Sequence, residues 1–192
     1  MNMGQTMITS GMFVLLVMSV ISANRMLNQN TETTLQSEAL ELSASIAEDL
    51  IAEASGKLYD VYDNGSGLQE SWEFGSCGPS SEENSQIPVP ADTLNPTTGV
   101  FKSADTFSDF DDYNGYKRLV TAGGISGFLV KSYVYYIDAV NPDVPTSWQT
   151  YFKKMDVRIS HPLYIVDKEG RSFVDGDTTK PVQVIYSSLM SY

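Results

Sequence analysis

The sequence predicts an α+β fold in which a long N-terminal α-helix, with an apolar first third and an amphipathic remainder, packs on a C-terminal antiparallel β-sheet. Three observations predict it. The first 60 residues contain no proline and keep helical spacing, the stretch 63–99 is crowded with Gly, Pro, Ser and Asn, and β-branched runs separated by turn signals follow from about residue 117. With 192 residues, the chain is long enough for one domain and an extension.

The helix is expected over residues 5–60, and its first part carries no charge. Residues 7–23, "MITSGMFVLLVMSVISA", are apolar on all sides of a helix and lie at the lower edge of the length that spans a bilayer. Apolar residues then recur at helical spacing with glutamates between them, which predicts a face that packs on the sheet. These residues are Leu35, Ala39, Leu42, Ile46, Leu50, Ala54 and Leu58.

The globular part is expected over residues 61–192. Residues 63–99 are predicted to form a long loop with at most one short strand, at "LQESWEF". Four strands are predicted at "GFLVKSYVYYID", "TYFKKMDVRIS", "LYIVD" and "PVQVIYSSLM", with a candidate fifth at "KRLVTAG". Because their connections are short, we expect an antiparallel sheet over about 117–190.

Composition and the rare residue types argue against several functions. The formal net charge of -12 argues against a nucleic-acid partner, because phosphate binding needs clustered Lys and Arg. The single cysteine, Cys77, cannot form an internal disulfide. The single histidine, His161, precedes a proline and is expected in a turn, and no nucleophile motif is present. We therefore expect neither an enzyme nor a cofactor.

The apolar third of the helix has nothing in its own chain to bury it, because the amphipathic part is needed to cover the sheet. Exposed apolar surface of this extent is expected to lie in a bilayer or against copies of itself. The candidate residues of such a membrane segment or filament core are Met12, Phe13, Leu15, Leu16, Val17, Val20 and Ile21.

At this point the sequence resembles the type IV pilins and the pseudopilins of type II secretion. The resemblance is carried by Gly4 followed by a continuous apolar helix, and by "DDYNGYKRLVT", "SYVYYIDAVNPDVP", "TYFKKMDVRISHP" and "PVQVIYSSLM". It implies a short leader over residues 1–4, processing between Gly4 and Gln5, a precursor in the inner membrane and an extracellular helical homopolymer. The sequence departs from the family pattern at "MNM", which has no basic residue, at Gln5, and at Thr9, where a glutamate is usual.

The acidic side chains in "SDFDDYNG" indicate a candidate calcium site, since hard cations prefer several converging oxygen ligands. The candidate ligands are Asp109, Asp111, Asp112 and Asn114, and the resemblance adds that some pseudopilins bind calcium in C-terminal loops. "VDGD" is a second acidic run. In an acidic protein such runs are more commonly solvated turns.

The sequence therefore predicts a non-enzymatic structural subunit of a pilus-like filament, assembled through its apolar helix after residence in the membrane. Tyr133 and Tyr135 are expected on one strand face and Tyr136 on the other, which suits ordinary packing of a strand with one partly buried face. The alternative is that exposed rings form subunit contacts or an adhesive surface. Two alternatives stay open. One is a single-pass membrane protein with an extracytoplasmic binding domain, and the other is an exported soluble protein that loses its first 23 or so residues.

Overall fold

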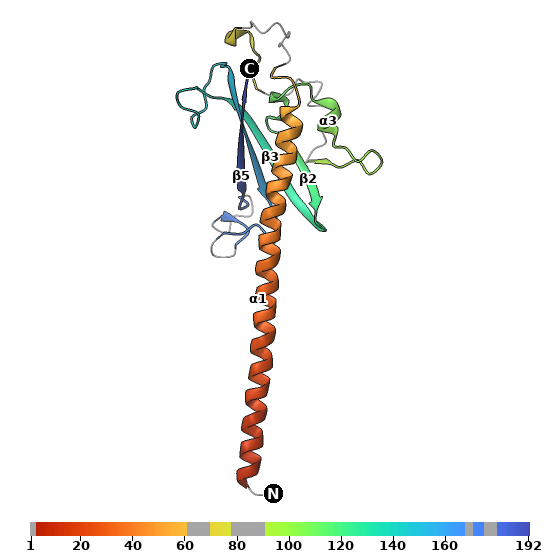
Figure 1. The fold of residues 1–192 in the computed structure, drawn as a ribbon, viewed down its shortest axis with the longest axis vertical. Coiled ribbons are helices and arrows are strands. Elements are labelled where there is room, and N and C mark those ends of the chain that lie inside the picture. Colours follow the sequence, from red (N-terminus) through yellow and green to blue (C-terminus); the bar gives the residue numbers. More distant parts are fainter. Residues whose placement is uncertain (1–2, 61–69, 78–90, 168–170, 175–179) are drawn as a thin grey trace. The chain divides into compact units, whose positions relative to one another are not determined.

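The computed structural model describes residues 3–60, 70–77, 91–167, 171–174 and 180–192 (Figure 1). The chain divides into two compact units, which are Met1–Glu38 and Ala39–Tyr192. In chain order the elements are α1 (Met3–Ser55), the 3-10 helix η1 (Ser71–Glu73), β1 (Asp92–Thr93), α3 (Lys102–Thr106), the 3-10 helix η2 (Asp111–Tyr113), β2 (Lys117–Ala122), β3 (Ile125–Tyr136), β4 (Phe152–Ser160) and β5 (Val184–Ser191).

The helix α1 is continuous through the polar interval "NRMLNQNTETTLQ". Within it Thr31, Thr33 and Thr34 donate their hydroxyl protons to backbone carbonyls four residues earlier, at 2.8 to 2.9 Å. The helix ends at Ser55, a few residues before the predicted end at 60. The Gly56 N–H still donates to the carbonyl four residues earlier, but Lys57 donates to Ala54, only three residues earlier, and Leu58 donates to Ser108 outside the helix.

Leu58, which the periodicity assigned to the helix face, lies beyond the end of α1. It forms an isolated parallel bridge with Asp109, and its side chain is exposed. The rest of the predicted helix face is confirmed from Ala39 to Ala54: Ala39, Ile46, Leu50 and Ala54 are buried, and Leu42 is partly buried against the core. Leu35, the first residue of the predicted face, is half-buried and lies outside the core.

The sheet has the order β1-β2-β3-β4-β5, and every pairing except the first is antiparallel. The predicted α+β architecture is confirmed. One strand was not expected: β1 lies within the predicted loop 63–99 and pairs in parallel with β2 over two residues. Residues 61–69 and 78–90 of that region lie outside the described part of the chain.

Two predicted strands are wrong. In "LYIVD" the backbone turns instead, because Nδ1 of His161 accepts the N–H groups of Leu163 and Tyr164 and closes a turn directly after β4. In the described part of "LQESWEF" residues 71–73 form η1, where the Glu73 carboxylate accepts the N–H of Glu70 in a capping arrangement.

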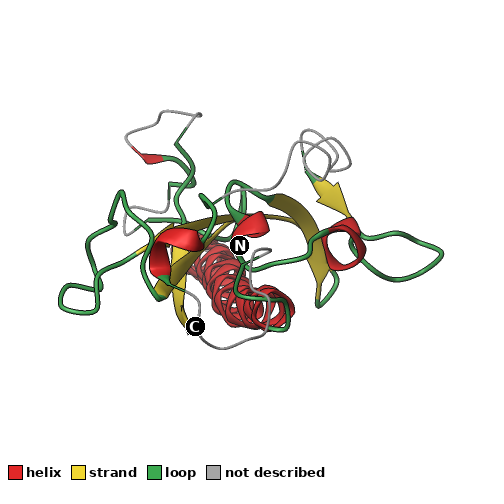
Figure 2. Ribbon diagram, turned by 90° about the horizontal axis from the view of Figure 1, so that it is seen from above, coloured by secondary structure: helices red, strands yellow, loops and turns green. Residues whose placement is uncertain are grey.

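The core of Ala39–Tyr192 lies between one face of α1 and one face of the sheet (Figure 2). Side chains alternate along β3 and β4, so that paired positions such as Val130 with Ile159 and Val134 with Met155 both point to the helix. Against them α1 packs Ile46 and other apolar residues at helical spacing, namely Ala39, Ala47, Leu50 and Ala54. No residue before Ala39 belongs to the buried part of this core among the described residues.

Candidate functional site

The seven residues predicted to form the membrane segment or filament core all lie on α1 with exposed side chains. Their exposed fractions run from 38% for Val17 to 68% for Phe13 and Leu15. Other apolar residues of the N-terminal unit, Met1–Glu38, are exposed as well, including Met7, Ile8, Val14, Met18, Met26 and Leu27. Large apolar side chains are therefore exposed on every side of this part of the helix, and the described residues of the chain do not bury them.

This part of α1 is long and apolar enough, by length and composition, to cross a membrane. A helix suits that environment because it satisfies its own backbone hydrogen bonds. Gly4 lies on the first turn of α1, where a Cβ atom would meet nothing within 4 Å. The predicted processing point between Gly4 and Gln5 is therefore within the helix.

In the acidic run considered as a calcium site, the Asp109 and Asp112 carboxylates accept hydrogen bonds from backbone N–H groups of the protein. Asp112 accepts the backbone N–H groups of Ser108 and Asp109 through Oδ2, at 2.8 and 3.1 Å, and Asp109 accepts the N–H of Asp112. Asn114 donates to the Cys77 carbonyl and accepts the N–H of Val134.

The third carboxylate of the run, Asp111, extends in a different direction and pairs with Lys153. The described residues hold no group of three or more His, Cys, Asp or Glu side chains that could bind a metal ion. The second acidic run, with Asp175 and Asp177, lies outside the described residues.

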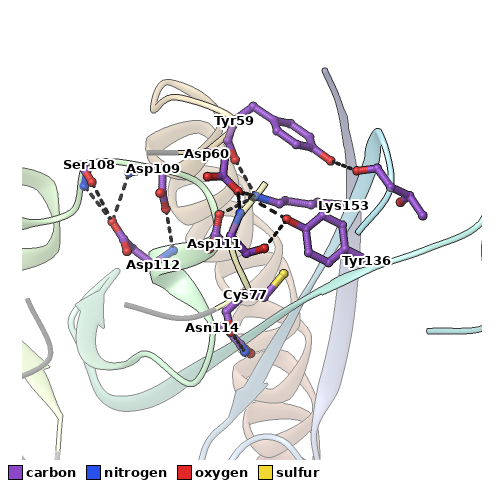
Figure 3. Close-up of polar contacts among 12 residues, drawn as sticks. Tyr59, Asp60, Cys77, Ser108, Asp109, Asp111, Asp112, Asn114, Tyr136 and Lys153 are labelled. Carbon is purple, nitrogen blue, oxygen red and sulfur yellow. Dashed lines mark hydrogen bonds and ion pairs between the residues drawn. The ribbon is translucent and has the colours of Figure 1, made fainter. Parts of the chain in front are cut away.

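A buried charge cluster surrounds Lys153 at the end of the sheet near the last turn of α1 (Figure 3). The Lys153 side chain has no exposed surface, and its Nζ lies 2.5 Å from Asp111 Oδ1 and 3.2 Å from Asp60 Oδ2. It also donates to the Tyr59 carbonyl at 2.7 Å. The rings of Tyr59 and Tyr136 lie 4.4 and 5.1 Å from the nitrogen, so aromatic faces complete its surroundings.

Burial sets the protonation of the neighbouring groups. It raises the pKa of the Cys77 thiol to about 12, with Asp111 adding to the effect, so the thiol is a poor nucleophile at neutral pH. The pKa of Asp109 rises to about 7, first through burial and then through the negative charges of Asp111 and Asp112. The pKa of Tyr136 is also raised by burial.

A second polar cluster holds the last turn of α1 against the rest of the unit. Glu53 accepts from Arg118 Nη1 at 2.9 Å through one oxygen, and from Ser103 Oγ and Tyr113 Oη at 2.7 and 2.8 Å through the other. The Arg118 guanidinium lies 4.5 Å from the ring centroid of Phe101. This carboxylate therefore joins α1 to β2, α3 and η2.

His161 and the tyrosines are placed as expected in outline. His161 is buried in the turn after β4, and its Nε2 lies 3.0 Å from the Ser126 carbonyl. Tyr133 is exposed on the outer face of β3, Tyr135 is half-buried on the same face, and Tyr136 is buried on the inner face.

The sequence reasoning missed both polar clusters. One signal was available for Lys153, because it shares its strand parity with Met155, Val157 and Ile159, which point inward. Asp60 and Glu53 gave no comparable signal, since their partners are distant in sequence.

Comparison with known proteins identifies no relative. No protein-family model, no curated protein and no solved structure matches this chain.

Proposed function

We propose that this chain is a structural subunit of an extracellular pilus-like filament, assembled through the apolar part of α1. One observation carries the proposal: the helical segment over residues 7–23 has no charge, and its large apolar side chains are exposed. The exposed residues include those from Met12 to Ile21 and apolar residues before and after them in the sequence. A folded chain does not retain such a surface without a partner environment.

The supporting observation is that the globular unit does not need this segment. Its core begins at Ala39 and is closed by α1 and the sheet, so residues 7–23 are available for association. In the filament each buried large side chain of this segment would contribute about 1.5 to 3 kcal/mol. A contact that joins different patches on successive identical subunits does not close, and therefore produces a fibre.

The mechanism is a change of surroundings for one helix. Before assembly the segment resides in the inner membrane, and on extraction it is buried against the same segment of neighbouring subunits. Processing between Gly4 and Gln5 would remove the short leader and leave Gln5 as the first residue. Mass spectrometry of the N-terminal peptide from sheared surface material tests this step directly.

The assembly test is Leu16→Asp, with Val140→Asp as its matched control. Leu16 lies in the middle of the segment, whereas Val140 is 90% exposed in the connection between β3 and β4, so each change adds the same carboxylate in a different place. A charge at a bilayer centre costs about 2.5 to 3.5 kcal/mol on insertion scales. In a filament the charge would also repeat in every subunit, where like charges repel.

Electron microscopy of sheared filaments is the measurement. We expect no filaments from Leu16→Asp and normal filaments from Val140→Asp. Normal assembly by Leu16→Asp would refute the role given to the apolar helix.

A second candidate is a single-pass membrane protein with an extracytoplasmic domain, which the membrane-compatible length of the segment favours. It predicts that detergent alone releases the chain and that no sheared filament contains it. The exported soluble form predicts instead a mature monomer that begins near Asn24 and needs no detergent.

A further inference from the structure

The surroundings of Lys153 combine features that amide formation requires. Its amine is fully buried, two carboxylates lie within 3.2 Å, and aromatic rings of Tyr59 and Tyr136 enclose the nitrogen. Exclusion of water favours the neutral forms of an amine and a carboxylic acid over the charged pair. A fixed approach of the two reacting groups also supplies a high effective concentration.

The two carboxylates differ in their surroundings, which assigns them different roles. Asp60 Oδ2 accepts the backbone N–H of Gly75 at 2.9 Å and lies 3.4 Å from Tyr136 Oη, so groups other than the lysine hold this carboxylate in place. Asp111 lies closer to Lys153, at 2.5 Å. Asp111 is therefore the acyl partner, and Asp60 is the group that receives and returns protons.

We propose that Lys153 and Asp111 form an intramolecular isopeptide bond. A proton passes from the Lys153 ammonium to the Asp111 carboxylate, which gives a neutral amine and a carboxylic acid. The Nζ lone pair then attacks Cγ of Asp111 and forms the new C–N bond. Asp60 takes a proton from the nitrogen and delivers it to a hydroxyl on Cγ, the C–O bond breaks, and one water leaves. No oxidant or co-reactant is needed.

The bond would link an interior strand of the sheet, near its end, to a segment 42 residues away in sequence. Lys153 lies on β4, which pairs with β3 and β5, and Asp111 begins η2. The chain has one cysteine and so cannot form an internal disulfide. An amide at this position would provide a covalent tie that does not respond to reductants.

Tryptic peptide mapping of the full-length, folded protein tests the bond. Cleavage after Lys and Arg places Asp111 in peptide 103–117 and Lys153 at the end of peptide 132–153. The bond protects Lys153 from cleavage, so we expect 103–117 joined to 132–154 with a mass about 18 Da, one water, below the sum of the two peptides. Free peptides 103–117 and 132–153 would overturn the proposal.

A second measurement does not depend on any variant. The protein is unfolded and treated with an amine-reactive acetylating reagent before digestion with a protease that does not cleave at lysine. Lys154 should be acetylated and Lys153 should not be. Acetylation of Lys153 in the unfolded chain would show a free amine and overturn the bond.

Variants locate the chemistry. Asp111→Ala and Lys153→Met should each remove the linked peptide, whereas Lys154→Ala should keep it in a form that extends to Arg158. Asp60→Asn should leave the peptides unlinked in a chain whose circular dichroism is unchanged, and linkage at wild-type yield would contradict the role of Asp60. A loss of about 18 Da that persists in Lys153→Met would be an aspartimide, and would overturn the assignment.

Discussion

Glu53 should be one of the most sensitive positions of the globular unit, because one carboxylate serves three donors. Replacing it with alanine leaves the Arg118 guanidinium buried without the partner that lies 2.9 Å from Nη1. It also removes the acceptor of Ser103 and Tyr113. Loss of one partner of a buried ion pair costs about 3 to 5 kcal/mol. In a domain of this size each 1 kcal/mol lowers Tm by about 2 to 4 °C, so we expect a fall of about 6 to 20 °C.

Urea unfolding of Glu53→Ala beside the parent chain measures the change, with Glu41→Ala as the matched control. Glu41 is exposed on the same helix, and its replacement should change stability by less than about 0.5 kcal/mol. The double variant Glu53→Ala, Arg118→Met should be less destabilised than the sum of the single changes, because the unpaired charge is then absent. A loss below about 1 kcal/mol for Glu53→Ala would refute the reasoning.

Three further outcomes follow from the same structure. The pKa of Asp109 is about 7 in the folded chain and about 3.9 in the unfolded chain. Its contribution to the free energy of unfolding is therefore greatest below about pH 4 and is lost as pH rises through 7. Asp109→Asn should remove this pH dependence from the stability measured by urea unfolding. Leu50→Ala, in the core, should cost about 2 to 5 kcal/mol, whereas Leu40→Ala at an exposed position should cost under about 1 kcal/mol. A fragment that begins at Leu35 should sediment as a folded, soluble monomer, since the core begins at Ala39; aggregation or an unfolded circular dichroism spectrum would contradict this.

The main elements could be predicted from the sequence because each has a long periodic signal. A helix without proline and three strands with alternating side chains need only local information. The failures are short or depend on a side chain. β1 has two residues and therefore no period, and "LYIVD" has the composition of a strand but follows His161, whose imidazole captures two backbone N–H groups.

The polar clusters were less accessible to prediction, for a different reason. Lys153 departs from the inward apolar pattern of β4, so its burial could have been suspected from sequence. Its partners could not, because Asp60 follows the end of α1 and Asp111 begins η2, and only the folded chain brings them within 3.2 Å of one nitrogen. The acidic run looked like one site, yet its carboxylates serve different partners.

Folding and assembly should be separable in this chain, because α1 carries two kinds of side-chain surroundings on one backbone. Its residues from Ala39 onward are buried by the sheet, whereas the residues from Met12 to Ile21 are exposed. A helix keeps its backbone hydrogen bonds in lipid, in water and against protein, so a transfer between environments changes only what its side chains contact. In the proposed filament, Leu16→Asp should therefore abolish assembly and leave the stability of the globular unit unchanged. Glu53→Ala should lower the stability of the globular unit and, at temperatures below its Tm, leave assembly unchanged. If either variant changes both assembly and stability, the two processes are coupled.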